Sequence, residues 1–512
     1  MCGFAGVIGY PVTDNCMRVA GMSLRHRGPD DFGIYQDSDI GLVHTRLSII
    51  DPSPAGHQPM VDLESGVVIV YNGEIYNHKA LAKEVTGKKR ISQTDTEVFL
   101  RLYLKYGLNC LRKLRGMFAF AIWDPRTKSL HLGRDRLGIK PLFFHQRGKT
   151  IFFGSEIRAL GILGVDMSAD LSSIKEFLET GRMCSGQRTF FDKVSSVLPG
   201  SSLTFADGVI KTEKYWTGPQ IEEASIVNLE EIECEIRNSI AIHLISDRPI
   251  GLSLSSGIDS ALLLDQIGKL GHDALDTFTF GFDEKRYDEI RRVDKCNFPI
   301  QLNRHNVVIK PSDVIEGLET AVTSFEAPLP GLGAFAGLKL CQAAKNAQVP
   351  VLLSGEGADE IFAGYEYYRE VNLLNCLAEG EKSRIFNKEL DAYCRLRKLN
   401  RDEVMHRVKK MSADHKLHLK APDGSSLRGR SYLHDSLRDI AAPVDSEEYS
   451  GYGLLRGAMT ADLLTLKVPK LLWYQDRASM ASGIEVRVPF LDHKLIDVAY
   501  AIPSNQLIRG GF

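Results

Sequence analysis

The apolar pattern of this chain changes once along its length, and that change constrains the fold more than any single motif. From about residue 225 onward, helical periodicity alternates with apolar strands that end in Gly/Ser-rich turns, which is typical of an α/β unit with a parallel sheet. The earlier part is typical of layered antiparallel sheets with helices near 96–106 and 171–180. Its short β-type runs are separated by Gly, Pro, Asn and Asp and lie at 41–50, 67–71, 118–123, 130–132 and 151–153.

The length also favours more than one core. At 512 residues the chain exceeds the size at which single hydrophobic cores usually stop growing. We therefore expect two domains, over 1–205 and 225–512, with the boundary inside 200–220.

Composition excludes several classes of function. With 63 Lys and Arg against 65 Asp and Glu, the net charge is -2, so no electrostatic footprint indicates a nucleic-acid or membrane partner. The charged segment 376–445 interleaves both signs, which is typical of solvated helical faces. The sequence shows neither a signal peptide nor an apolar run of about 20 residues. Nine scattered cysteines without a CxxC pair indicate reduced thiols, so we predict a cytoplasmic protein acting on small molecules.

A cysteine follows the initiator methionine. If Met1 is removed, Cys2 carries both a thiol and a free α-amine, and an α-amine with a pKa of about 8 can serve as the base for its own thiol. Taken alone, a cysteine at this position is more often a small buried hydrophobe. Only further residues can decide between these two interpretations.

Residues suited to amide hydrolysis follow several β-type runs, and we expect them in loops. Arg46 suits a bidentate pair with a substrate carboxylate, and Asp95 suits an α-ammonium group. Asn72 and Gly73 can offer a side-chain amide and a backbone N–H to an oxyanion, although an isolated Asn-Gly pair usually forms a hairpin turn.

Five ordered motifs in the first 120 residues resemble the class II glutamine amidotransferases, which are N-terminal-nucleophile hydrolases. They are MCGFAG at 1–6, RHRGPD at 25–30, HTRLS at 44–48, YNGEIYN at 71–77 and RGMFAF at 115–120. The resemblance implies a sandwich of antiparallel sheets between helices, with Cys2 as the nucleophile and Asn72 and Gly73 as the oxyanion hole. The glutamine-binding residues that it implies are Arg46, Leu47, Ser48, Ile49, Ile50, Asn72, Gly73, Glu74 and Asp95.

Two Gly/Ser-rich turns follow apolar runs in the second half. Residues 255–260, SSGIDS, precede a helical pattern, and such a turn directs N–H groups and hydroxyls at an anion. No Lys follows the glycine, so the turn differs from a Walker loop, and Asp259 suits Mg²⁺ at phosphates. Residues 354–360, SGEGADE, carry three carboxylates, which implies bound cations. Two such turns at strand ends resemble the pyrophosphatase-type ATP domain.

Together with EVRVPFLDH at 485–493 and QDRASM at 475–480, these motifs resemble glutamine-hydrolysing asparagine synthetase over nearly the whole chain. The resemblance implies ATP and Mg²⁺ as cofactors, Glu356 in acyl-adenylate formation, and Asp259 and Asp359 at the metal. The ATP and pyrophosphate contacts that it implies are Leu254, Ser255, Ser256, Gly257, Asp259, Ser260, Phe280, Ser354 and Gly355.

The resemblance predicts ATP-dependent amidation of a carboxylate through an acyl-adenylate, with aspartate as acceptor and ammonia led through an enclosed apolar passage. A uronic-acid sugar of surface polysaccharide is the alternative acceptor, and a regulator that only binds glutamine or nucleotide is an alternative of another class. Synthetases of this kind usually continue past 504–512 into a segment with a lysine. Its absence implies truncation, a charge supplied elsewhere, or impaired synthetase activity. Relatives are often dimers, which allows a homodimer here.

Overall fold

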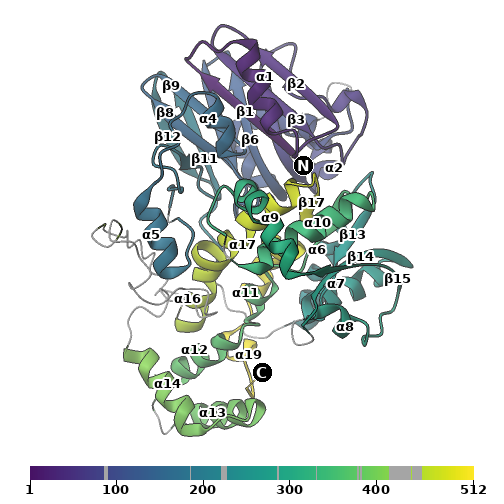
Figure 1. Ribbon diagram of the computed structural model, residues 1–512, viewed down its shortest axis with the longest axis vertical. Helices are drawn as coiled ribbons and strands as arrows, with labels where there is room; N and C mark the ends of the chain where they lie inside the picture. Colours follow the sequence, from purple (N-terminus) through teal and green to yellow (C-terminus); the bar gives the residue numbers. More distant parts are fainter. Residues whose placement is uncertain are drawn as a thin grey trace.

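The chain forms two units that meet along a broad interface (Figure 1). The computed structural model describes residues 1–85, 90–184, 186–220, 228–284, 288–329, 331–377, 380, 383–413, 437, 440 and 453–511. Its N-terminal part has antiparallel sheets and its C-terminal part a parallel sheet, so the fold class expected from the sequence is confirmed.

Two six-stranded antiparallel sheets pack face to face in the N-terminal unit. The first has the order β10-β8-β9-β1-β3-β2 and comprises β1 (Cys2–Ile8), β2 (Asp31–Gln36), β3 (Ile40–Arg46), β8 (Phe143–Arg147), β9 (Thr150–Gly154) and β10 (Ser195–Ser196). The second has the order β12-β11-β7-β6-β5-β4 and comprises β4 (Met60–Val61), β5 (Val68–Ile75), β6 (Gly116–Asp124), β7 (Ser129–Arg134), β11 (Ser201–Ala206) and β12 (Val209–Lys214).

Alternating side chains explain why these strands form a sandwich. Phe4, Leu42, Val70 and Ala121 point inward and are fully buried between the sheets. Helices cover the outer faces: α1 (Asp14–Ser23) and α4 (Ile157–Ile162) on the first sheet, α2 (His78–Leu81) and α3 (Asp95–Tyr106) on the second. Short 3-10 helices and one further helix complete the unit, at η1 (Pro54–Gly56), η2 (Ala82–Val85), η3 (Gly107–Lys113) and α5 (Leu171–Thr180).

The C-terminal unit is built on a five-stranded parallel sheet of order β15-β14-β13-β16-β17. The chain runs from β13 outward to β14 and β15 and then returns to the other side of β13 at β16, which opens a crevice at the carboxyl ends of these two central strands. The strands are β13 (Ile250–Ser253), β14 (Ala274–Phe282), β15 (Gln301–Ile309), β16 (Val351–Leu353) and β17 (Glu485–Arg487).

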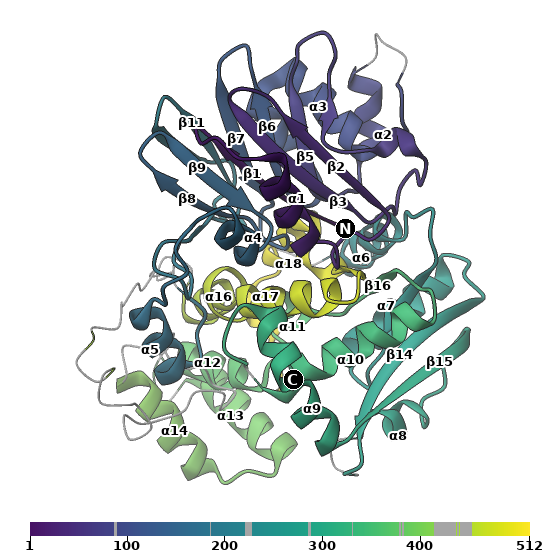
Figure 2. The ribbon, with the colours of Figure 1, turned by 45° about the horizontal axis from the view of Figure 1, so that its top comes forward.

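Helices surround this sheet, and a further group of helices extends the C-terminal unit away from the sandwich (Figure 2). Those that accompany the sheet are α6 (Leu229–His243), α7 (Ile258–Lys269), α8 (Glu289–Val293), α9 (Pro311–Phe325), α10 (Leu332–Asn346), α11 (Ala358–Phe362), α17 (Lys467–Met480), η9 (Pro489–Leu491) and α18 (His493–Tyr500). The extension comprises α12 (Glu366–Leu377), α13 (Arg384–Arg397), α14 (Arg401–Ala413), α16 (Leu454–Ala461), the π-helical turn η8 (Asp462–Leu466) and α19 (Ser504–Leu507).

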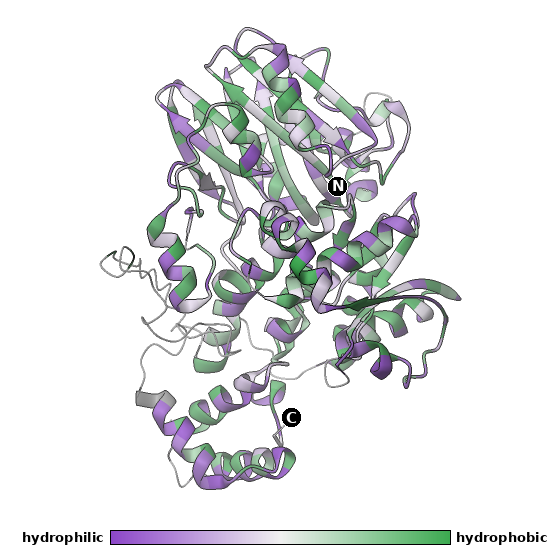
Figure 3. Cartoon of the chain, in the orientation of Figure 1, coloured by the Kyte–Doolittle hydropathy of each residue, from purple (hydrophilic) through white to green (hydrophobic). Residues whose placement is uncertain are grey.

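The charged segment 376–445 is mostly helical where it is described. Helix α13 buries Phe386, Leu390 and Tyr393, while α14 is largely hydrophilic where Figure 3 colours it. Residues 378–379, 381–382, 414–436, 438–439 and 441–445 of this segment lie outside the described residues. Within the described ranges, no helix is long and apolar enough to cross a membrane.

Buried ion pairs join the two units. Both outer nitrogens of the Arg27 guanidinium contact the Asp476 carboxylate, at 2.9 and 3.1 Å, and Arg27 also binds Glu156 at 2.9 Å. All three side chains are almost completely shielded from solvent. The N-terminus lies at the same junction, beside β17 (Figure 1).

Candidate functional site

Cys2 begins the central strand β1 at the junction of the two units. Its main-chain N–H donates to Asn72 Oδ1 at 2.9 Å, and its carbonyl accepts from Arg27 Nε at 3.1 Å. Burial raises the pKa of the Cys2 thiol, while the terminal ammonium group, the Leu47 backbone N–H and the Arg46 guanidinium act in the opposite direction. The thiol is therefore shielded from solvent and has positive charges nearby.

Asn72 and Gly73 lie within strand β5, not in a loop or hairpin turn. They pair with Ala119 and Phe118 of β6. A Cβ on Gly73 would lie only 2.1 Å from the Met117 carbonyl oxygen, so the close approach of the strands requires glycine. Sequence patterns usually associate Asn-Gly with a turn, and here the close strand packing prevails.

The side chain of Asn72 offers a free donor beside Cys2. Asn72 is fully buried, and its Nδ2 has no hydrogen-bond partner among the described residues. A buried amide hydrogen without a partner is costly unless a ligand satisfies it. The same amide group thus holds the main chain of Cys2 through Oδ1 and can offer Nδ2 to an oxyanion.

Arg46 organises the loop that follows β3. Its guanidinium donates to the carbonyls of Ser53 at 3.0 Å, Ile50 at 3.2 Å and Asp51 at 2.6 Å. These bonds end the strand at Arg46, whereas the sequence pattern suggested β structure up to residue 50. The loop bends back over Cys2, and Leu47, Ser48, Ile49 and Ile50 are all buried there.

Two buried carboxylates, Glu74 and Asp95, come from strand β5 and from the start of helix α3. Asp95 begins helix α3, and its Oδ2 accepts from Tyr71 Oη at 2.8 Å and from the Ile75 N–H at 2.9 Å. Burial raises the pKa of Asp95, and it raises that of Glu74 well above the ordinary value, with Asp95 adding to the rise. Glu74 Oε1 has no hydrogen-bond partner within the described ranges, so it remains available to a cationic group.

The residue 255–260 turn connects β13 to helix α7 at the centre of the parallel sheet. Ser260 Oγ accepts from the Ser255 N–H at 3.1 Å and donates to the Ser255 carbonyl at 3.0 Å. Ser256 binds the Glu289 carboxylate through both its N–H and its hydroxyl, at 2.9 and 2.6 Å. Gly257 caps the helix without a side-chain hydrogen bond, which leaves the first turn of α7 facing the crevice.

The residue 354–360 turn, after β16, lies directly against the first one. A Cβ on Gly355 would lie 3.1 Å from the Asp259 Cβ. Gly357 has φ +98°, a conformation that favours glycine, and a Cβ there would strike Leu491. The Ser354 N–H donates to the Arg487 carbonyl at 2.9 Å, so β17 supports this turn.

Like charges gather where the two turns meet. Burial raises the pKa of Asp259 to about 6, and Asp359 and Glu356 add to the rise. Glu356 Oε2 is buried and has no hydrogen-bond partner among the residues described. Two neighbouring carboxylates that disfavour the charge of Asp259 fit a site that a divalent cation and phosphates complete.

Protein ligands alone do not form a metal cage here. In the described part of the chain, no group of three or more His, Cys, Asp or Glu is arranged to hold a metal ion. Mg²⁺ usually takes one or two carboxylates and completes its shell with water and substrate phosphates, so Asp259 and Asp359 fit that mode.

The predicted nucleotide contacts line the same crevice. The Leu254 N–H donates to the Phe278 carbonyl at 2.9 Å, and its own carbonyl accepts from Thr279 Oγ1 at 2.8 Å. Phe280, two residues further along β14, is half-buried next to Phe282. Leu254, Phe280, Ser354 and Gly355 thus come from three neighbouring strands or the turns that follow them.

An apolar cluster crosses the interface of the two units between Cys2 and strand β16. It contains Met1, Leu47, Ile49, Tyr76 and Met117 of the N-terminal unit with Val351 and Met480 of the C-terminal unit. We call this set the junction cluster. Val351 opens strand β16, whose end carries the 354–360 turn, so the cluster reaches from one predicted site toward the other.

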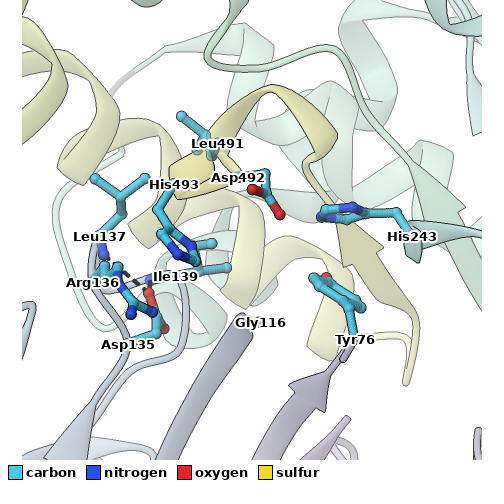
Figure 4. Close-up of a pocket in the computed structure, with 10 residues that line it drawn as sticks. All are labelled: Tyr76, Gly116, Asp135, Arg136, Leu137, Ile139, His243, Leu491, Asp492 and His493. Carbon is cyan, nitrogen blue, oxygen red and sulfur yellow. Dashed lines mark hydrogen bonds between the residues drawn. The ribbon is translucent and has the colours of Figure 1, made fainter. Parts of the chain in front are cut away.

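A cavity of about 20 Å³, room for one small molecule, adjoins the junction cluster (Figure 4). The rings of Tyr76 and His243 face each other across the interface with centroids 4.0 Å apart. Burial lowers the pKa of His243 to about 4, so this ring is neutral. The lining residues are Tyr76, Gly116, Asp135, Arg136, Leu137, Ile139, His243, Leu491, Asp492 and His493.

A larger open pocket of about 570 Å³ lies beside the acidic turns. The rings of Tyr365 and Tyr367 stack at 5.7 Å, and Lys467 Nζ lies 3.5 Å from the Tyr365 ring centroid. Tyr365 Oη donates to Glu360 Oε1 at 2.8 Å, which connects the pocket to the 354–360 turn. The lining residues are Tyr365, Glu366, Tyr367, Glu370, Tyr393, Arg407, Lys467, Lys470 and Leu471.

Sequence reasoning assigned no role to three residues that contact the Cys2 region. Arg27 holds the Cys2 carbonyl, Glu485 binds the N-terminal ammonium group at 3.0 Å, and Arg487 binds Glu485 at 2.7 Å. All three lie in motifs visible in the sequence. Their shared location was not visible, because it depends on how the units dock.

Comparison with known proteins agrees with this arrangement. Residues 1–216 match the model of the glutamine amidotransferase domain, and residues 231–512 match that of asparagine synthase. Glutamine-hydrolyzing asparagine synthetase 1 of Bacillus subtilis is 30% identical over 556 aligned residues, which cover all of this chain and 82% of that protein. Asparagine synthetase 3 of the same organism is 28% identical over 94% of this chain and 77% of its own length.

Proteins with other names also match this chain. Amidase chyE of Penicillium rubens is 31% identical over 72% of this chain and 60% of its own length. A solved structure of the allosteric regulatory enzyme of purine biosynthesis is 15% identical, with a TM-score of 0.33 over 58% of this chain and 70% of its own, a likeness too remote to bear on the fold. The synthetase matches span both units, and the chain belongs to the asparagine synthase family, with a glutamine amidotransferase domain at its N-terminal end.

Proposed function

We propose that this chain hydrolyses glutamine at Cys2 and uses the ammonia to convert aspartate into asparagine, releasing glutamate, AMP and pyrophosphate. Its family membership already makes it a ligase, a glutamine-dependent amidotransferase that uses ATP. The acceptor, the adenylate route and the residue roles below belong to the proposal.

The glutaminase half-reaction begins when Met1 is removed and the α-amine of Cys2 becomes free. The amine takes the thiol proton, and the thiolate attacks the side-chain amide carbon of glutamine. Asn72 Nδ2 and the Gly73 N–H then stabilise the oxyanion. Ammonia leaves, and water hydrolyses the γ-glutamyl thioester to glutamate.

Glutamine recognition uses the charged groups around that pocket. Arg46 retains N–H groups beyond those that hold its loop, and these suit the α-carboxylate of glutamine. Glu74 and Asp95 supply carboxylates for the α-ammonium group. The buried loop residues Leu47, Ser48, Ile49 and Ile50 form a wall of the pocket.

The second half-reaction takes place at the paired turns of the parallel sheet. The acceptor carboxylate attacks the α-phosphate of ATP, pyrophosphate leaves, and ammonia then displaces AMP from the acyl-adenylate. Residues Ser255, Ser256, Gly257 and Ser260 hold pyrophosphate, and Glu356 assists adenylate formation. Mg²⁺, held by Asp259 and Asp359, would neutralise charge on the phosphates.

The junction cluster is the observation that carries this two-site proposal. Free ammonia would be protonated in bulk water near neutral pH, so the two sites need a dry connection. Buried apolar side chains of both units lie between Cys2 and β16, and the adjoining cavity has room for one molecule of this size. We therefore infer that ammonia passes along the junction cluster.

The open pocket near Tyr365 favours a second candidate acceptor. Stacked tyrosines suit the apolar face of a sugar ring, carboxylates such as Glu366 and Glu370 suit its hydroxyls, and Lys467 suits an anion. Free aspartate needs only a small pocket with a cation. An acceptor that carries a uronic acid on a sugar would use the whole pocket.

The test is acceptor-dependent release of pyrophosphate. Full-length protein would receive glutamine, ATP and Mg²⁺ with aspartate, with a uronic-acid sugar, or with neither. We expect pyrophosphate and AMP in equal amounts with aspartate. Release only with the sugar would establish the second candidate, and no acceptor-dependent release would refute the synthetase proposal.

A further inference from the structure

The N-terminal ammonium group is held by a carboxylate of the other unit. Met1 N lies 3.0 Å from Glu485 Oε2, and both groups are completely shielded from solvent. Glu485 begins strand β17 of the C-terminal unit, whereas Met1 directly precedes β1 of the N-terminal unit (Figure 1). The start of the chain is thus bound across the interface.

Removal of Met1 changes what the nitrogen of Cys2 needs. As a peptide nitrogen it has one N–H, which donates to Asn72 Oδ1 at 2.9 Å. As an ammonium group it has three, and in a dry region each requires an acceptor. Glu485 Oε2 simultaneously loses its partner, the ammonium group of Met1, and Glu74 Oε1 already lacks one among the residues described.

We propose that Glu485 is a positioning residue for the α-amine of Cys2, so that the C-terminal unit helps to assemble the nucleophile of the N-terminal unit. The inference rests on the proposed role of Cys2. One proton moves, from the Cys2 thiol to its own α-amine, which gives a thiolate and an ammonium group. The Glu485 carboxylate stabilises that ammonium group as it forms, the role that a third group plays in other nucleophile–base pairs.

Glu485 is itself held firmly in an ionised state. Although burial opposes ionisation, the terminal ammonium group, Arg487 and Lys140 lower the pKa of Glu485 to about 2. Arg487 Nε donates to Glu485 Oε1 at 2.7 Å, and Arg487 is anchored in turn by the carbonyls of His243 and Ile245, both at 2.7 Å. Oε2 therefore faces the N-terminus with a fixed charge.

The strand that carries Glu485 also supports the ATP site. In the parallel pair β16–β17, Val351 lies opposite Glu485, and Leu353 lies opposite Arg487. The Arg487 carbonyl then binds the N–H of Ser354, the first residue of the acidic turn. One strand of three residues thus links the amine of Cys2 to the turn predicted to bind nucleotide.

The test compares glutamine hydrolysis by the wild-type chain and by Glu485→Gln, with Cys2 shown by mass spectrometry to be the first residue. We expect kcat/KM to fall about tenfold or more. The acidic limb of the pH profile should move to lower pH, because a neutral amide no longer favours the ammonium form. Other charged groups around the amine remain in place: Arg46, Glu74, Asp95, Lys140 and Arg487.

Two further variants separate positioning from folding and docking. Glu485→Asp keeps a charge for Arg487 and should give intermediate kcat/KM with the acidic limb near that of the wild type. Glu326→Gln removes another buried carboxylate of the C-terminal unit, one that accepts from the Ile157 and Arg158 N–H groups of the N-terminal unit at 3.0 and 2.7 Å. This control should leave the pH profile unchanged.

The inference is overturned if Glu485→Gln keeps the wild-type rate and pH profile, or if Glu326→Gln reproduces its loss and its shift. A wild-type chain that begins with Cys2 and hydrolyses no glutamine would instead refute the proposed function, and this inference with it.

Discussion

At the scale of single residues, both predicted sites contain polar groups that are buried without partners. Asn72 Nδ2 and Glu74 Oε1 near Cys2, and Glu356 Oε2 in the 354–360 turn, all lack hydrogen-bond partners within the described residues. Each such group costs stability unless a ligand satisfies it, so its presence at a predicted site is consistent with ligand binding there.

Asn72→Ala removes the side-chain donor at the predicted oxyanion hole. We expect kcat for glutamine hydrolysis to fall about 100- to 1000-fold, as for other oxyanion-hole amides. Ammonia-dependent synthesis should persist, because the ATP turns are untouched. Steady-state assays with each nitrogen source measure both values, and an undiminished glutaminase would contradict the assignment.

At the scale of elements, the two turns at 255–260 and 354–360 are held close together although both carry carboxylates. Strands β13 and β16 are direct neighbours, so the turns that follow them cannot separate. Burial raises the pKa of Asp259, and the neighbouring carboxylates Asp359 and Glu356 add to the rise, a cost that the proposed cation would offset.

Asp259→Asn should therefore stabilise the ligand-free protein above pH 6. The folded chain holds the Asp259 proton more tightly than the unfolded chain does, because its pKa is raised from 3.8 to about 6. The stabilisation of the folded chain by this tighter proton binding is complete below pH 3.8 and is lost as the pH rises through 6. The Tm of the variant should equal that of the wild type near pH 3.8 and exceed it at pH 7.

A matched control lies on the same helix. Asp265, on α7 beside Lys269, is only partly buried, and Asp265→Asn should leave the pH dependence of the wild type unchanged. Adding Mg²⁺ with ATP should raise the Tm of the wild type. The same addition should raise the Tm of Asp259→Asn much less. Equal shifts for both proteins would contradict the metal role of Asp259.

At the scale of the whole molecule, the two units are joined by an interface that is buried and partly charged. Asp476→Asn leaves the buried Arg27 guanidinium with Glu156 as its remaining carboxylate partner, and breaking such a buried pair costs about 3–5 kcal/mol. Calorimetry should show a lower Tm, or separate transitions of the two units. Glu233→Gln, in an exposed pair with Arg237, should change stability by less than about 1 kcal/mol.

Much of the fold and part of the site could be predicted from the sequence. Alternating strands, the two Gly/Ser-rich turns and the Cys2 motif depend on local patterns, which a single sequence shows directly. The Arg27–Asp476 pair joins residues 449 positions apart, and Glu485 reaches Met1 across 484. Contacts of this kind depend on docking of whole units, and no local periodicity encodes them.

The most direct test of the account is the nitrogen source used by Cys2→Ala. The wild-type chain should release pyrophosphate with either glutamine or ammonia, given ATP, Mg²⁺ and the acceptor. The variant should lose all glutamine-dependent release and keep ammonia-dependent release within about twofold, because only the nucleophile is removed. Loss of both activities, or survival of the glutamine-dependent one, would contradict two sites joined by ammonia.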